Sequence, residues 1–267
     1  MPEGNELHRW AKLHKAAFAG KKVHVDSPQG RFHDAPILDN RILVDVIAVG
    51  KHLGYDFGKI AGERRILHIH MGLYGDFTEG HPPMPEPRGA LRLRIWTKAD
   101  WLELRGPTDC SLFTQQQWDS LLARLGPDPL NRDPGVKMVD RILTRKTPIG
   151  ALLMDQSILA GVGNIYRAEL LFRARISPFR AGNEVSSADL NVIYKDAGVL
   201  MRHGMVDRRI VTTKPKDRPH KKGEPLDEEV HYVYRRQGKP CFICGTKILT
   251  KPMAGRNLFW CPTCQTE

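Results

Sequence analysis

Long apolar runs are absent from this chain of 267 residues. No stretch approaches the roughly 20 apolar residues that a membrane-spanning helix requires, so a helical membrane protein is excluded. The opening residues, MPEGNE, are acidic and unlike a targeting sequence. We therefore expect a soluble, cytoplasmic protein with no membrane partner.

Acidic residues are few relative to basic ones. The chain has 41 lysines and arginines against 30 aspartates and glutamates, which gives a formal net charge of +11. This excess favours a polyanionic partner, either nucleic acid or an acidic membrane surface. No basic amphipathic helix with a bulky apolar face is evident, and an interfacial membrane protein would need one. The composition therefore predicts a nucleic-acid-binding protein.

Cysteine is limited to five residues, and most of them form two Cys-x-x-Cys pairs around the stretch 245–260. This spacing is typical of a zinc ribbon. Disulfides or a redox pair are the alternatives, but no secretory signal is seen and a redox motif needs only one pair. We predict one structural Zn²⁺ per chain, because protein thiolates fill every position of a tetrahedral site. Its ligands are Cys241, Cys244, Cys261 and Cys264. The remaining cysteine, Cys110, is expected to be a small buried apolar residue.

The segment between the cysteine pairs predicts a β-hairpin, with strands at 247–251 and 257–260 and a turn at 253–256. A piece this short cannot bury a useful core, so bound metal has to supply its folding free energy. The tip of the hairpin carries Arg256. The finger is therefore interpreted as a scaffold that presents this arginine.

The first part of the chain predicts one helix followed by β-strands. Apolar residues recur at helical spacing over 6–19, and Gly20 is suited to end that helix. Residues 91–95 alternate leucine or isoleucine with arginine, which predicts one buried and one cationic face, whereas 79–87 is proline-rich and predicts a loop. The expected strands cover 22–26, 42–49, 65–71, 90–96 and 101–104. Residues 1–125 are interpreted as a two-layer antiparallel β domain with an N-terminal helix.

The pattern changes at the proline-rich stretch 126–134, which predicts a linker. Ser187 is expected to cap the last predicted helix. The stretch 212–224 is polar, basic and interrupted by prolines, which predicts a mobile loop. The predicted helices cover 136–143, 149–157, 164–173 and 187–201. The chain is thus expected to be α+β, with a helical domain at 135–230 and a zinc finger at 231–267.

Two short motifs could carry chemistry. In the turn that contains Gly161 and Gly163, followed by Asn164 at a helix start, backbone amides could bind a phosphate. A simple helix–helix turn or a helix–hairpin–helix module would give the same pattern.

In Pro2-Glu3-Gly4, removal of Met1 would leave a secondary amine on Pro2 that can condense with an aldehyde. An α-amino group with a pKa near ~8 is about a tenth neutral at pH 7, whereas an ordinary lysine is below ~0.1% neutral. The chain terminus is therefore the better amine nucleophile, and Glu3 could transfer its proton.

Taken in order, the motifs resemble the formamidopyrimidine-DNA glycosylase and endonuclease VIII family of DNA repair enzymes. They are Pro2-Glu3-Gly4 before a helix, Gly50-Lys51 after a strand, the segment 155–169, and the finger with Arg256. The match spans nearly the whole chain, and the ordered set is more specific than any motif except the finger. The start, the finger and Leu73-Tyr74-Gly75 are most similar to the endonuclease VIII branch, of an actinobacterial kind.

The resemblance implies a β-sandwich domain with an N-terminal helix, a helical domain with a helix-two-turns-helix, and a zinc finger. It also implies a monomer that binds damaged DNA in the cleft between domains. Pro2 would attack C1′ of the damaged nucleotide, and Glu3 would protonate the sugar ring oxygen and assist β-elimination. Lys51 would bind phosphate and assist the δ-elimination that follows.

The resemblance also implies a set of DNA contacts. Asn164 and Arg256 would hold phosphates beside the flipped nucleotide. Leu73 and Tyr74 match residues that fill the vacated base stack, with ordinary core packing as the alternative; Gly72 stands where a glutamine often completes this wedge. His68 and His70 share one face of a strand, which could suggest a metal site. Because no third ligand is placed beside them, a structural or phosphate-contacting role is favoured, and His70 is taken as the DNA-binding one of the two.

Three functions therefore compete. The first is a DNA glycosylase and AP lyase that excises oxidised bases, pyrimidines in preference to the purine 8-oxoguanine. The second is a non-catalytic zinc-ribbon protein that binds nucleic acid. The third is the same enzyme class with a preference for 8-oxoguanine and formamidopyrimidines. Pro2, Glu3 and Lys51 favour the enzyme, because a binding protein has no need of a free terminal amine.

Overall fold

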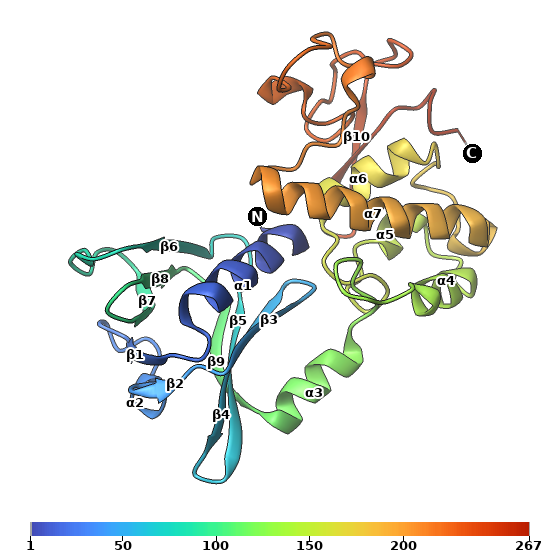
Figure 1. The fold of residues 1–267 in the computed structure, drawn as a ribbon. Helices are drawn as coiled ribbons and strands as arrows, with labels where there is room; N and C mark the ends of the chain where they lie inside the picture. Colours follow the sequence, from blue (N-terminus) through green and yellow to red (C-terminus); the bar gives the residue numbers. More distant parts are fainter. Residues whose placement is uncertain (1, 267) are drawn as a thin grey trace. The chain divides into compact units, whose positions relative to one another are not determined.

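The computed structural model describes residues 2–266, which form two compact units that we describe separately (Figure 1). Unit 1 runs to Arg124 and unit 2 begins at Leu125. Within the described range, the helices are all too short or too polar to cross a membrane.

Unit 1 is a sandwich of two antiparallel sheets, with α1 (Gly4–Phe18) packed against strand β3. One sheet has the strand order β2-β1-β7-β8-β6 and the other β3-β4-β5-β9. Both sheets and α1 bury apolar side chains in one core, where a side chain such as Phe18 contributes about 1.5–3 kcal/mol. The strands are β1 (Lys22–Asp26), β2 (Arg41–Ile42), β3 (Asp45–Val49), β4 (His52–Ile60), β5 (Glu63–His70), β6 (Asp76–Gly80), β7 (Leu91–Trp96), β8 (Trp101–Arg105) and β9 (Asp109–Thr114). The two further helices are α2 (Ala35–Leu38) and α3 (Gln115–Arg124).

Several elements of unit 1 differ from the sequence prediction. Strands β4, β6 and β9 and helix α3 were not predicted, and the strand expected at 42–49 is divided into β2 and β3. Strand β4 lacks a clear alternation because it is buried on both faces. Its Gly54 lies beneath Trp118 of α3, where an added Cβ would be 2.8 Å from the indole ring. Close packing on α3 therefore explains a glycine that interrupts the strand pattern.

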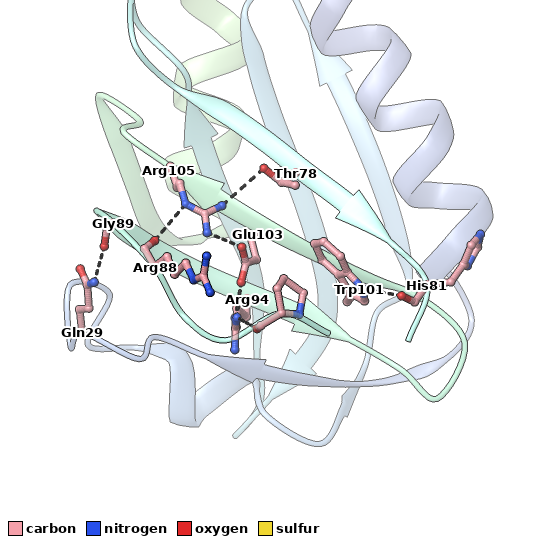
Figure 2. A network of polar contacts seen from close by, with 10 residues as sticks. Gln29, Thr78, His81, Arg88, Gly89, Arg94, Trp101, Glu103 and Arg105 are labelled. Carbon is pink, nitrogen blue, oxygen red and sulfur yellow. Dashed lines mark hydrogen bonds and ion pairs between the residues drawn. The ribbon is translucent and has the colours of Figure 1, made fainter. Parts of the chain in front are cut away.

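A polar network fixes the proline-rich loop to the five-stranded sheet of unit 1 (Figure 2). This loop covers 81–89 and not 79–87 as predicted, because β6 continues to Gly80. Arg94 and Arg105 both bind the Glu103 carboxylate. Arg94 also donates to the carbonyl of Pro85, and the Trp101 indole donates to that of His81 at 2.9 Å. The cationic face expected for 91–95 is therefore wrong at Arg94, which is buried beneath the loop and paired with an acid.

Unit 2 contains the helices and the finger hairpin. Helices α4 and α6 have the predicted bounds, whereas α5 ends five residues before the expected position 157, and α7 continues beyond 201 to Asp207. The cap of α7 is Ser186 and not Ser187, because the Ser186 hydroxyl accepts the Asp189 N–H. The elements are α4 (Val136–Leu143), α5 (Ile149–Leu152), α6 (Asn164–Arg173), α7 (Ser187–Asp207), β10 (Leu249–Met253), β11 (Arg256–Trp260), and the 3₁₀ turns Gly182–Glu184, Pro215–Asp217 and Asp227–Glu229.

The segment 212–218 is anchored, which corrects the expectation of a mobile loop over 212–224. The Thr212 hydroxyl donates to the buried Glu169 carboxylate. The Thr213 hydroxyl donates to the Glu229 carbonyl at 2.6 Å, and Arg218 is buried against Thr213. The anchors Glu169 and Glu229 lie outside the segment in sequence, so its local composition did not reveal them.

Candidate functional site

The candidate catalytic residues of unit 1 begin at the start of α1. Pro2 is half-buried, and Glu3 is 1% exposed and forms the N-cap of the helix. The Glu3 carbonyl accepts the Glu6 N–H at 2.9 Å, which fixes the entry of the chain into the helix. Buried side chains such as Leu7 and Trp10 hold α1 on the sandwich. The backbone thus places the Glu3 carboxylate beside Pro2, at the helix end where the dipole favours negative charge.

Lys51 lies in the tight turn between β3 and β4, next to a row of histidines. His52 of β4 is directly opposite His70 of β5, and their rings are 4.9 Å apart. The Nδ1 of His52 is 2.9 Å from Nε2 of His68, and Nδ1 of His68 is 2.6 Å from the Asp109 carboxylate. A continuous chain of polar contacts therefore leads from Asp109 through His68 to His52, which lies against His70.

Burial lowers the pKa of all three histidines. The pKa of His52 falls to about 3, because the charges of His68, His70 and Arg124 add to the effect of burial. Lys51 is among the charges that lower the pKa of His70 further. The three rings are therefore neutral at neutral pH and act as hydrogen-bonding groups.

Sequence reasoning missed His52 and Asp109. It placed His68 and His70 on one face but left out β4 and β9, the strands that carry their neighbours. Counting back along β4 from the turn at Ala61 would have placed His52 opposite Met71, one residue from its true partner His70, because the register shifts between Asp56 and Lys59.

The predicted wedge residues lie on a tight turn after β5. Leu73 is 45% exposed and Tyr74 is 85% exposed, so core packing does not hold for them. Gly72 has a φ of +64°, and a Cβ there would lie 1.7 Å from the Thr108 hydroxyl oxygen. A glutamine at position 72 would thus require this turn to move. With glycine there, the turn presents two exposed apolar side chains, Leu73 and Tyr74, at its tip.

In unit 2, Asn164 and the finger hairpin meet at a buried arginine. Asn164 is 6% exposed; its Nδ2 donates to the Asn257 carbonyl at 3.0 Å, and its Oδ1 accepts from Arg167. Arg167 is fully buried and donates to the Gly150 carbonyl at 3.3 Å and the Met253 carbonyl at 3.1 Å. Arg256, next to Asn257, is exposed at the hairpin tip. The contacts therefore fix Asn164 beside the strand that carries Arg256.

The glycine turn before α6 is held differently from the prediction. The Gly161 N–H, expected to face a phosphate, donates to the Gln156 side-chain oxygen at 3.0 Å. The amide nitrogen of Gln156 donates in turn to the Val162 carbonyl at 2.9 Å. The Gly161 amide is thus used within the turn, and Asn164 and Arg256 remain the candidate phosphate ligands.

The four predicted zinc ligands lie together in the finger. Their sulfur atoms are all within 4.8 Å of one another, with Cys241 and Cys264 at 3.9 Å and Cys244 and Cys261 at 3.5 Å. Zn–S bonds of about 2.3 Å in a tetrahedron place sulfur atoms about 3.8 Å apart. The cluster therefore fits one structural Zn²⁺, with no position left for a substrate.

Comparisons with known proteins agree with this architecture. Residues 125–215 match the family described as "Formamidopyrimidine-DNA glycosylase H2TH domain", and residues 238–266 match "Zinc finger found in FPG and IleRS". The chain is 45% identical over 275 residues to the Endonuclease 8 1 of Mycobacterium tuberculosis, and this covers all of both proteins. The chain belongs to the formamidopyrimidine-DNA glycosylase and endonuclease VIII family.

One further relative belongs to this family, and one solved structure shares the fold. It is 30% identical over 278 residues to the formamidopyrimidine-DNA glycosylase of Thermus thermophilus, covering 100% of this chain and 99% of that protein. A solved complex of Lactococcus lactis Fpg with DNA containing an abasic site has a TM-score of 0.78 at 19% identity, covering 99% of this chain and 100% of that one. The predicted resemblance and the α+β fold, with β-sandwich, helix-two-turns-helix and zinc finger, are confirmed. The expected enzyme class, DNA glycosylase with AP lyase activity, is that of the family.

Proposed function

We propose that this protein is a bifunctional DNA glycosylase and AP lyase of base excision repair, acting as a monomer on damaged DNA in the cytoplasm. The observation that carries this proposal is the buried Glu3 beside Pro2 at the start of α1. A carboxylate at this position can give or take a proton beside the Pro2 nitrogen, which is the role that the proposed reaction requires. The full-length similarity to Endonuclease 8 1 supports the same conclusion.

The proposed reaction starts at the secondary amine of Pro2, after Met1 is removed; Met1 itself lies outside the described residues. The Pro2 nitrogen forms a bond to C1′, the bond from C1′ to the damaged base breaks, and the proton that the Pro2 nitrogen loses neutralises the departing base. Glu3 protonates the ring oxygen as the sugar opens, which leaves an iminium ion between Pro2 and C1′. Glu3, now a carboxylate, accepts a proton from C2′, which expels the 3′ phosphate, and a second elimination assisted by Lys51 expels the 5′ phosphate. Water finally hydrolyses the bond between Pro2 and the sugar fragment.

We assign Lys51 and His70 to the phosphate beside the opened sugar. Lys51 supplies positive charge, and the neutral His70 supplies a hydrogen bond. His52 packs against His70 and restricts its ring, so the phosphate meets a preformed group. In unit 2, we assign Asn164 and the exposed Arg256 to neighbouring phosphates, with Arg167 as the residue that positions Asn164.

We assign Leu73 and Tyr74 to the space that the flipped nucleotide leaves in the duplex. Both side chains are exposed on a turn that packs closely on Thr108. Inserting them covers an apolar surface that otherwise faces water, which offsets part of the cost of unstacking. Because Gly72 has no side chain, this wedge makes fewer polar contacts with the opposite base.

We propose oxidised pyrimidines as the preferred lesions, in contrast to 8-oxoguanine opposite cytosine. The higher identity to Endonuclease 8 1 than to the Thermus formamidopyrimidine-DNA glycosylase supports this preference. Oxidised pyrimidines have lost aromatic stacking and are cheaper to flip, so even a permissive pocket selects them. The exposed part of the stretch 212–224 has no large apolar anchor for a purine.

The proposal is tested by single-turnover excision on matched duplexes that contain thymine glycol or 8-oxoguanine opposite cytosine. We expect faster release of thymine glycol, followed by strand cleavage with phosphate at both ends of the gap. Faster release of 8-oxoguanine would assign the chain to the purine-preferring function. Binding without base release or cleavage on either duplex would support the non-catalytic alternative.

A further inference from the structure

Unit 2 has a cavity of about 570 Å³ that the proposed repair reaction does not use. It lies between the C-terminal part of α6, the middle of α7, the segment 214–217 and the first zinc-binding turn. The lining residues that determine its chemistry are Arg175, Val192, Lys195, Val199, Lys216 and Ile243.

The walls of this cavity are fixed by polar contacts. Arg173 of α6 binds the Asp196 carboxylate of α7 through two nitrogen–oxygen contacts of 2.6 and 2.7 Å. The Tyr232 hydroxyl donates to Asp217 at 2.6 Å and accepts the Lys214 N–H at 2.9 Å, which holds the segment 214–217. A ligand therefore meets a preformed site and loses little affinity to ordering the protein.

The rim of the cavity is cationic. Five basic side chains line it, but only two acidic ones, Asp196 and Asp217, and both of these acids are already engaged within the walls. Arg175, Lys195 and Lys216 are exposed, and none has an ion-pair partner among residues 2–266. The cavity thus carries positive charge that an acidic ligand would complement.

The exposed apolar part of the lining is aliphatic. Val192 and Val199, one heptad apart on α7, are 57% and 42% exposed, and Ile243 is 43% exposed. The aromatic residues of the lining, Phe172 and Tyr232, stack on each other with centroids 4.8 Å apart and are almost fully buried. The cavity therefore lacks the accessible aromatic faces on which single-stranded nucleic acid stacks its bases.

The cavity is also separate from the candidate phosphate ligands of unit 2. Asn164 begins α6, whereas the cavity lies at the other end of this helix, about 13 Å along its axis. Arg256 begins β11, whereas Cys264, which lines the cavity, comes four residues after the other end of that strand. A ligand in the cavity therefore need not compete for Asn164 or Arg256.

We propose that this cavity binds an acidic peptide segment of a partner protein, with an aliphatic or aromatic side chain as its anchor. The anchor packs between Val192, Val199 and Ile243, and carboxylates on either side of it meet Arg175, Lys195 and Lys216. This inference is independent of the proposed catalytic function, because none of these residues belongs to the catalytic or DNA-binding set.

A random peptide library displayed on phage, selected against the zinc-loaded full chain, tests the proposal. We expect enriched peptides that combine acidic residues with leucine, isoleucine or phenylalanine. Fluorescence anisotropy of those peptides should show that Arg175→Glu with Lys195→Glu weakens binding about tenfold or more, since reversed charges repel the acidic ligand. Val199→Ser should weaken binding through the lost anchor contact.

Matched variants on the same unit serve as controls. Lys221→Glu with Lys222→Glu reverses two exposed charges outside the cavity, and Val206→Ser removes an 81% exposed valine from the same helix. Both controls should bind the peptides as the native protein does, and all variants should keep the native unfolding temperature. The proposal is overturned if no peptide is enriched, if enriched peptides lack acidic residues, or if cavity and control variants bind them equally. It is also overturned if the cavity variants lose affinity for abasic duplex DNA while peptide binding is unchanged, which would mark a nucleic-acid surface.

Discussion

Replacing Arg167 tests whether one buried side chain connects Asn164 to the finger. The guanidinium group of Arg167 donates to the carbonyls of Gly150 and Met253 and to the side chain of Asn164. The substitution Arg167→Met keeps much of the apolar stem but removes every donor. We therefore expect Arg167→Met to loosen Asn164 and the finger hairpin without leaving a large cavity.

The magnitude follows from those contacts. Hydrogen bonds from a charged donor contribute about 1.5–3 kcal/mol each, and their sum is reduced because they share one side chain. We expect Arg167→Met to lower the free energy of unfolding of unit 2 by about 3–5 kcal/mol. With Asn164 no longer held, affinity for DNA with an abasic-site analogue should fall about tenfold or more.

Hydrogen exchange at the amides of α6, β10 and β11 measures the first effect, and anisotropy with labelled duplex measures the second. Arg132→Met is the matched control, because Arg132 is exposed in the same unit and its loss changes the net charge equally. The control should stay within about 0.5 kcal/mol of the native protein. The reasoning is refuted if Arg167→Met shows native protection and binds DNA as the control does.

Three further predictions concern metal, acid and salt. Cys244→Ser should abolish zinc binding and unfold the finger while unit 1 stays folded on its own core, as metal analysis and hydrogen exchange would show; a native metal content would contradict this. Burial lowers the folded-state pKa of His52 to about 3. The contribution of His52 to the free energy of unfolding should therefore be constant above about pH 6.5 and fall as the pH drops toward 3. At pH 5 the His52 contribution is about 2 kcal/mol, and urea unfolding of His52→Phe should lack that loss; an unchanged pH dependence would refute the assignment. If roughly five to eight phosphates are neutralised, log K for duplex binding should fall with log salt at a slope of about −4 to −7, and a flat plot would exclude a basic DNA-binding surface.

The sequence was sufficient where local pattern decides the structure. Helices α4 and α6 begin and end where their periodicity and the glycine turn predicted. The cysteine spacing predicted the four-sulfur cluster, because metal geometry allows few alternatives.

The sequence was insufficient where contacts between distant segments decide the structure. His52 and Asp109 join the histidine row only through the pairing of β4 and β9 with β5. Arg94 is buried because Glu103 on the next strand neutralises it, although its strand pattern indicated an exposed face. The segment 212–218 is fixed by Glu169 and other distant residues that local composition does not reveal.

The central claim, that Pro2 is the nucleophile, is tested most directly by borohydride trapping on DNA that contains an abasic site. The reaction should give one covalent protein–DNA adduct, and peptide mapping should place the DNA on the Pro2 nitrogen. Protein that retains Met1 has an amide at this position and should give no adduct, although it still binds the DNA. Undiminished trapping by the Met1-retaining protein, or an adduct mapped to Lys51, would contradict the account.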